Sequence, residues 1–280
     1  MFSTFDKAEK TESAKHAERE WHDDFYRPLA PLAYPGSQDK FLEWFRRMEL
    51  TPFYEGGWNW WADLRREAMD LVGNVRGLRV LDYGCGLGRL GIYLALRGAD
   101  VRGFDLSAEA VGIAESAARR YGLSAHFETM DAERLTYAGD FFDLVVGFGV
   151  LHHVVKYPNA SSQLYRILKP GGWAVFCETL WDNPVINLLR RFTREAEEAG
   201  DAYLTEAKIR SFAQGFSQVE MRKRHLLYML KRLARRPEAN PAVALQPRSF
   251  WKMVKHVEDA LLHLPLLPRY CGEVIVVLQK

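Results

Sequence analysis

The chain has few cysteines, no long apolar run and almost no net charge. Only 3 Cys occur among 280 residues, which excludes a disulfide framework and favours a reduced, cytoplasmic protein. The longest apolar runs, near residues 144–155 and 274–278, are too short to span a bilayer, and the charged N-terminal residues show no signal-peptide pattern. A formal net charge of +2 gives no general reason to expect a nucleic-acid partner. What remains, at 48% hydrophobic and 26% charged residues, predicts a globular protein with a sizeable core.

The two ends of the chain differ from its middle. Residues 1–60 are rich in aromatic side chains and broken by prolines, and apolar residues at helical spacing over 41–50 and 60–72 predict helical pieces that pack over the rest. Residues 226–270 are punctuated by prolines and too long for a simple connection, so we expect an insertion with its own helices. The basic stretch 222–236 is typical of a solvated helix face; contact with an acidic substrate group or a membrane surface is a minority interpretation.

From residue 78 onward, short apolar runs alternate with helical segments. The expected strands cover 79–82, 101–104, 126–130, 142–148, 173–180, 216–224 and 273–278. The expected helices cover 89–97, 108–121, 158–168 and 205–214, with a tight turn at 169–172. Because each parallel crossover needs a helix, this alternation predicts a parallel sheet covered on both faces.

A glycine cluster follows the first of these strands. Residues 86–91 match the dinucleotide-binding pattern between a strand and a helix. Asp105 ends the next strand, 21 residues after Gly84, where a carboxylate can accept hydrogen bonds from ribose hydroxyls. This much predicts an adenosine ligand without choosing between a nicotinamide cofactor and another nucleoside.

Asp82 distinguishes between a nicotinamide cofactor and another nucleoside ligand. It stands at the carboxyl end of the first strand, directly before the glycines, where a pyrophosphate would meet a carboxylate in a poorly solvated site. A ligand with a cationic amino group is attracted there instead. S-adenosylmethionine carries an amino group and a sulfonium and no phosphate, and its carboxylate suits the N-terminus of the following helix.

At these residues the sequence resembles the class I S-adenosylmethionine-dependent methyltransferases. Five ordered segments carry the resemblance: VLDYGCGLG at 80–88, GFDLS at 103–107, MDAE at 130–133, FFDLVVGFGVLHHV at 141–154 and LKPGGW at 168–173. The resemblance implies an α/β, Rossmann-like, doubly wound, seven-stranded and mostly parallel sheet with the last strand antiparallel, plus helical N-terminal and insertion cap elements. It also implies a small-molecule branch similar to quinone, sugar and natural-product methyltransferases.

The resemblance assigns roles to individual residues. Asp105 is expected to hold the ribose, and Asp131 with its neighbours the adenine amino group. The full set of expected cofactor-binding residues is Asp82, Tyr83, Gly84, Cys85, Gly86, Gly88, Asp105, Leu106, Asp131, Ala132, Glu133 and Phe148. Cys85 is expected to be a small residue that fits the loop rather than a reactive thiol.

Catalytic and acceptor residues are expected beside this site. His152 and His153 begin a helix at the carboxyl edge of the sheet, where either can contact the acceptor or act as a base, and Glu178 is a third candidate. Tyr54, Trp58 and Trp61 are expected, with His152, to line the acceptor. The sequence has no Cys/His set with metal-ligand spacing, so no metal site is predicted.

These inferences predict four segments and one principal function. Residues 1–74 form a cap, 75–225 the cofactor-binding core, 226–270 an insertion cap and 271–280 a terminal core strand. The predicted function is methyl transfer from S-adenosylmethionine to a small-molecule hydroxyl, on an apolar, natural-product or glycolipid-like acceptor; a nitrogen or carbon acceptor is the alternative. The oligomeric state stays open between monomer and homodimer.

Three other classes of protein compete with this reading. An NAD-dependent oxidoreductase is disfavoured by Asp82 and by the segment Asp131-Ala132-Glu133. A non-catalytic cofactor-binding protein would be distinguished by its lack of turnover. A nucleic-acid or protein methyltransferase is disfavoured because an Asn/Asp-Pro-Pro-Tyr/Phe signature is missing at residues 147–150.

Overall fold

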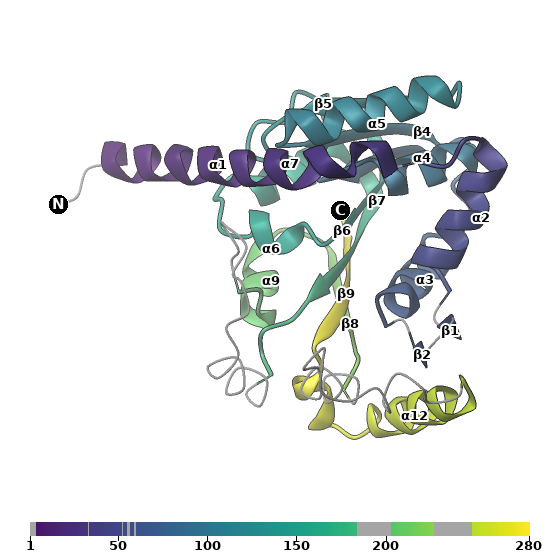
Figure 1. Ribbon diagram of the computed structural model, residues 1–280. Coiled ribbons are helices and arrows are strands. Elements are labelled where there is room, and N and C mark those ends of the chain that lie inside the picture. Colours follow the sequence, from purple (N-terminus) through teal and green to yellow (C-terminus); the bar gives the residue numbers. More distant parts are fainter. Residues whose placement is uncertain are drawn as a thin grey trace.

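A seven-stranded sheet forms the centre of the molecule (Figure 1). The computed structural model describes residues 4–32, 34–51, 53–54, 57–58, 60–183, 203–226 and 248–280. The sheet runs in the order β5-β4-β3-β6-β7-β9-β8. Its strands are β3 (Arg79–Tyr83), β4 (Asp100–Asp105), β5 (Ala125–Thr129), β6 (Phe142–Phe148), β7 (Leu168–Thr179), β8 (Gln218–Arg224) and β9 (Glu273–Gln279).

The pairing of the strands confirms the predicted topology. The five strands β5 to β7 pair in parallel, and β9 pairs antiparallel with both β7 and β8. The chain order reverses at β3, which lies between β4 and β6. In open sheets of this kind ligands bind beyond the carboxyl ends of the strands at such a switch point. The carboxyl ends of β3 and β4 carry Asp82 and Asp105.

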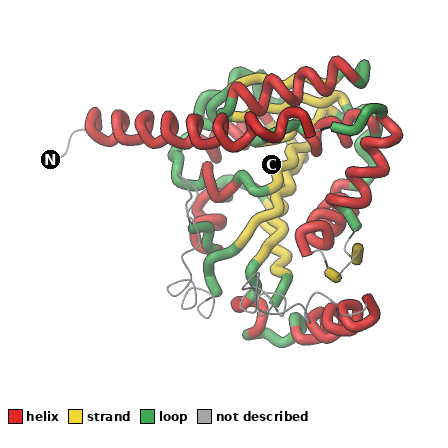
Figure 2. Tube along the Cα trace, viewed as in Figure 1, coloured by secondary structure: helices red, strands yellow, loops and turns green. Residues whose placement is uncertain are grey.

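Helices cover both faces of the sheet (Figure 2). They are α1 (Thr4–Tyr26), α2 (Gln38–Glu49), α3 (Trp60–Val72), α4 (Arg89–Leu96), α5 (Ala108–Arg120), α6 (Leu151–Val154), α7 (Ala160–Ile167), α9 (Glu206–Phe212) and α12 (Arg248–Leu261), with 3-10 turns η1 (Arg27–Leu32) and η2 (Leu267–Tyr270). One buried cluster joins α2 to α5 with one face of the sheet, and a second joins α6, α7 and α9 with the other. These two cores fix the positions of the strand ends.

Residues 169–172, where a tight turn was expected, are counted within β7 but interrupt its pairing with β6, and Gly171 has a positive φ of 74°. Leu168 pairs with Phe142 of β6, and the register shifts before the pairing continues. On the other side, Gly171 donates a backbone hydrogen bond to Lys280, and Lys280 donates one to Gly172. The segment is therefore a bulge in β7 that is held on one side by Lys280.

The N-terminal region contains the expected helical pieces and, before them, one long helix that apolar spacing did not predict. Helix α1 lies across the carboxyl edge of the sheet (Figure 1). Its inward side chains are polar: Lys15 and Glu18 are each 4% exposed, and His22 is half-buried. An apolar periodicity cannot find a helix with such a face. Helices α2 and α3 confirm the two expected helical segments.

Two other predicted segments are described only in part. Tyr54 and Trp58 belong to the short antiparallel pair β1 (Phe53–Tyr54) and β2 (Gly57–Trp58), but their side chains lie outside the described residues. Of the basic stretch, residues 222–224 belong to the edge strand β8 rather than to a helix, and residues 227–247 lie outside the described part. None of the described helices combines the length and apolarity of a membrane span.

Candidate cofactor and acceptor site

The turn from β3 into α4 is built from closely packed glycines. Gly88 is the N-cap of α4 with φ 78°, and its amide donates to the Cys85 carbonyl at 2.8 Å. A Cβ on Gly88 would lie 2.5 Å from the Ala114 Cβ of α5, and one on Gly86 (φ +49°) would lie 2.8 Å from the Tyr26 hydroxyl of α1. Only glycine allows this backbone path and this closeness.

Asp82 is buried directly beneath this loop. Its side chain is 2% exposed, and its Oδ2 accepts a hydrogen bond of 2.8 Å from the Gly91 amide in the first turn of α4. Burial raises the pKa of Asp82 to about 7, against the opposing effect of the Gly91 hydrogen bond. A cationic group placed beside this carboxylate would restore its ionised form.

Asp105 ties the glycine loop to the next helix. Its Oδ2 accepts from the Gly86 amide at 2.8 Å and its Oδ1 from the Ser107 amide at 3.0 Å, where Ser107 caps α5. Burial raises the pKa of this carboxyl above its usual range, although both amide hydrogen bonds oppose that effect. Asp82 and Asp105 therefore flank the loop at the carboxyl edge, and a site lined by carboxylates and glycine amides fits a cationic nucleoside better than a diphosphate.

The two acids expected at the adenine are held by α1. Lys15 Nζ lies 2.6 Å from Asp131 and 2.7 Å from Glu133. Burial by itself lowers the pKa of Lys15, but the two carboxylates outweigh burial and raise it. Glu133 also accepts from the Asn159 amide at 3.0 Å. Asp131 and Glu133 are thus both in contact with Lys15, which was not predicted from the sequence.

Helix α1 and the chain after it contact the cofactor segments at further points. Asp23 accepts a hydrogen bond from the Ser107 hydroxyl, and Tyr34 donates one to the Leu87 carbonyl. Lys15 and Asp23 were not predicted from the sequence. Their only signal is charge repeated at helical spacing, which is also the pattern of a solvated face.

His152 and Glu178 were predicted as separate candidates from the sequence, and the fold brings their side chains into contact. Glu178 is fully buried near the end of β7, and its Oε2 lies 2.8 Å from His152 Nδ1 on α6. Its Oε1 accepts from the amides of Val150 and Leu151, at 2.8 and 2.6 Å. The first turn of α6 and the imidazole of His152 are therefore oriented by one carboxylate.

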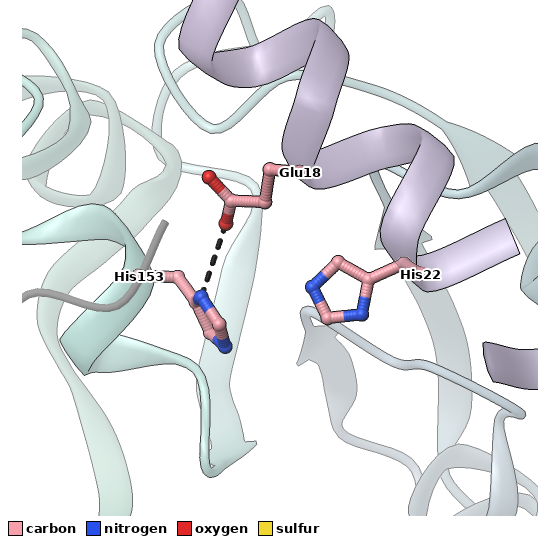
Figure 3. Close-up of side chains that lie close together, drawn as sticks. All are labelled: Glu18, His22 and His153. Carbon is pink, nitrogen blue, oxygen red and sulfur yellow. Dashed lines mark ion pairs between the residues drawn. The ribbon is translucent and has the colours of Figure 1, made fainter. Parts of the chain in front are cut away.

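His153 takes part in a different cluster. Figure 3 shows its ring facing Glu18 and His22, two residues of α1. His153 Nδ1 lies 3.0 Å from Glu18 Oε1, and the rings of His22 and His153 are 5.3 Å apart between centroids in an edge-on arrangement. Each of the three residues offers one ligand atom, and these atoms lie within 4.8 Å of one another. Glu18 and His22 were not predicted from the sequence.

The remaining predicted residues are placed as follows. The Tyr83 ring is fully buried between Phe104 and Phe176, so its side chain is part of the core and only its backbone can face a ligand. The guanidinium of Arg65 lies 5.4 Å from the Trp61 ring and 5.7 Å from the Phe148 ring, which brings an expected acceptor residue near an expected cofactor residue. Leu106 is half-buried and Ala132 is buried, both at the same sheet edge. All three cysteines are buried, and burial raises the pKa of each thiol.

Comparison with known proteins matches the part of the chain that builds this site. A family model described as a methyltransferase domain matches residues 80–172. A ubiquinone biosynthesis O-methyltransferase of Paraburkholderia phymatum is 33% identical over 141 residues, which are 46% of this chain and 61% of that protein. A protein of the same name from Rhizobium etli is 38% identical over 106 residues, 38% of this chain and 42% of that protein. The chain thus covers less than two thirds of these relatives.

Solved structures share the fold. A methyltransferase from Mesorhizobium loti superposes with a TM-score of 0.53 at 20% identity, covering 79% of this chain and 97% of that one. Phosphoethanolamine N-methyltransferase 2 of Haemonchus contortus, solved with S-adenosylhomocysteine, gives 0.54 at 17% identity over 94% of this chain and 60% of that one. The SpnF cyclase gives 0.52 at 22% identity over 92% and 94%, so the fold alone does not fix the reaction. Residues 80–172 thus match a methyltransferase domain, and the ordered motifs within this segment resemble those of the class I S-adenosylmethionine-dependent methyltransferases.

Proposed function

We propose that the protein transfers a methyl group from S-adenosylmethionine to a hydroxyl of a small, apolar acceptor. The observation that carries this proposal is the contact between His152 and the buried Glu178 at the carboxyl edge of the sheet. A hydroxyl acceptor gains from a base that removes its proton, whereas an amine need only be neutral. The printed name of the two relatives, ubiquinone biosynthesis O-methyltransferase, supports oxygen as the acceptor atom.

The cofactor would be held by the groups that surround the glycine loop. Asp105 would accept hydrogen bonds from the ribose hydroxyls, and Asp82 would attract the amino group of the methionyl part. Asp131 would accept from the adenine amino group, which requires it to share or exchange its contact with Lys15. Bound S-adenosylmethionine supplies an electrophilic methyl group on a positively charged sulfur, so the protein needs no covalent nucleophile.

His152 is the proposed base, and Glu178 its positioning residue. With Nδ1–H donating to the Glu178 carboxylate at 2.8 Å, the neutral imidazole carries its lone pair on Nε2. Nε2 would take the proton of the acceptor hydroxyl, while bound S-adenosylmethionine would supply the methyl group to the acceptor oxygen. The resulting imidazolium is stabilised by Glu178, which the structure pairs with His152. Base catalysis of this kind contributes about 10²–10⁴-fold to a rate.

Steady-state kinetics with labelled S-adenosylmethionine and a panel of phenol and catechol acceptors test this role. His152→Gln should lower kcat by about 10²-fold or more and leave the affinity for S-adenosylhomocysteine unchanged. Glu178→Gln should lower kcat by a smaller factor and shift the pH at which the rate rises, because the imidazolium loses its partner. A control is His126→Gln, since His126 is half-exposed on β5 and outside the proposed site. Normal turnover by His152→Gln would remove it as the base.

The binding alternative is distinguished by the same assay. A protein that keeps the cofactor site without methyl transfer would bind S-adenosylhomocysteine and release no labelled product from any acceptor. The structural likeness to the SpnF cyclase is the reason to measure product as well as binding.

A further inference from the structure

Three side chains from two distant parts of the chain converge between α1 and α6. Glu18 and His22 are four residues apart and so occupy one face of α1, while His153 belongs to α6. Glu18 is 4% and His153 9% exposed, and His22 is half-buried. We propose that Glu18, His22 and His153 bind a divalent transition-metal cation of the Zn²⁺ type and thereby fasten α1 to the core.

The donor set has the composition that such a cation takes. Two imidazole nitrogens and one carboxylate oxygen are a common Zn²⁺ ligand set that leaves a further coordination position for water or another oxygen. The same set also binds other first-row divalent metals, in the order of their general affinity. Alkaline-earth cations prefer sites made entirely of oxygen, so two imidazoles disfavour Mg²⁺ and Ca²⁺.

The distances agree with a site that closes by side-chain rotation. Ligand atoms at about 2.0–2.1 Å from a tetrahedral Zn²⁺ are about 3.4 Å apart. Glu18 Oε1 and His153 Nδ1 are 3.0 Å apart, and no pair among the three ligand atoms exceeds 4.8 Å. An inward movement of about 1–1.5 Å by one ring therefore completes the geometry.

Outer contacts already orient the carboxylate. Glu18 Oε2 accepts from the Tyr157 hydroxyl at 2.9 Å and from Lys156 Nζ at 3.2 Å, so Oε1 is the oxygen that faces His153. Metal-binding carboxylates are held by such outer hydrogen bonds, which fix the direction of the ligand atom. The positive charge of Lys156 opposes a cation, and the Asp105 carboxylate, which interacts electrostatically with both imidazoles, offsets it.

Helix α1 contains its own matched control. His16 and Glu20 are also four residues apart, with Nδ1 and Oε2 separated by 3.6 Å, but both are about 70% exposed. They do not belong to the three-residue cluster. The two pairs therefore differ in burial and in the third ligand, and not in residue type or helix.

The test is a titration of the full chain, stripped of metal by a chelator, with Co²⁺ followed by its visible absorption and with Zn²⁺ as competitor. The wild type should bind one equivalent. Glu18→Gln and His22→Gln should weaken binding by at least about 100-fold, and Tyr157→Phe by about 10–100-fold. His16→Gln and Glu20→Gln should bind as the wild type does.

Two outcomes would overturn the site. One is the absence of stoichiometric binding by the wild type, and the other is equal weakening by His22→Gln and His16→Gln. His22 is half-buried, so His22→Gln should fold and give an interpretable binding measurement even where Glu18→Gln fails to fold. Circular dichroism of each variant verifies the fold. Metal content requires neither cofactor nor acceptor, so this result is independent of whether the protein methylates a hydroxyl.

Discussion

Replacing Asp82 by Asn should make the protein more stable and a weaker binder of its cofactor. The carboxyl is buried beneath the glycine loop, and burial raises its pKa from 3.8 to about 7. At about 1.4 kcal/mol per pKa unit, the ionised carboxylate costs up to about 4 kcal/mol in the unliganded protein above pH 7. The sign follows from the raised pKa: the cost is absent below pH 4, grows as the pH rises and is complete above pH 7.

Thermal unfolding of the wild type and Asp82→Asn at pH 5 and pH 8 measures this effect. An amide oxygen can still accept from Gly91, so the variant should melt several degrees higher at pH 8 and show a smaller gain at pH 5. Asp143→Asn is a control that should lower the melting temperature instead of raising it. The Lys169 ion pair outweighs burial at this carboxyl, so the pKa of Asp143 is lowered. A gain that is equal at both pH values, or a loss at pH 8, would refute the reasoning. Calorimetry should show weaker S-adenosylhomocysteine binding by the same variant.

Two further predictions concern the frame around the site. The buried His225, whose Nδ1 lies 2.8 Å from Glu273 and whose Nε2 lies 3.6 Å from Asp63, has its pKa raised from 6.5 to about 9, although burial alone would lower it. Its charged form should add up to about 3 kcal/mol of stability below pH 6.5 that is lost as the pH passes 9, so denaturant unfolding of His225→Gln against wild type should differ more at pH 6 than at pH 10. Gly88→Ala should destabilise by about 1–3 kcal/mol or more in thermal unfolding, because positive φ and the 2.5 Å approach to Ala114 act together. Gly122→Ala, with positive φ and open space, should lose less, and equal losses would contradict the packing argument.

The sequence predicts those features that depend on residues close together in the chain. Asp82 and Asp105 stand at the carboxyl ends of two apolar runs that are followed by glycines and by a helix cap, so the mostly parallel sheet could be predicted from the sequence. His152 and Glu178 were each identified, but their contact depends on α6 and β7 being brought together by the fold.

Other features were not predicted because their sequence patterns are typical of different structures or involve residues far apart in the chain. Helix α1 presents Lys15, Glu18 and His22 inward, and a charged face is read from sequence as solvated. The Glu18, His22 and His153 cluster joins residues more than a hundred positions apart, which no ligand spacing reveals. The expected turn at 169–172 is present as a bulge within β7, and its bonds to Lys280 depend on the C-terminal residue, which local sequence does not reveal.

The most direct test of the account is calorimetric titration of the wild type and Asp105→Ala with S-adenosylhomocysteine and with NAD. We expect S-adenosylhomocysteine to bind the wild type and NAD not to bind it. Loss of a charged acceptor for the ribose hydroxyls, at about 1.5–3 kcal/mol, should weaken binding by roughly 10–150-fold in Asp105→Ala. Binding of NAD at this site, or an unchanged affinity of Asp105→Ala for S-adenosylhomocysteine, would contradict the placement of the cofactor at the carboxyl edge of β3 and β4.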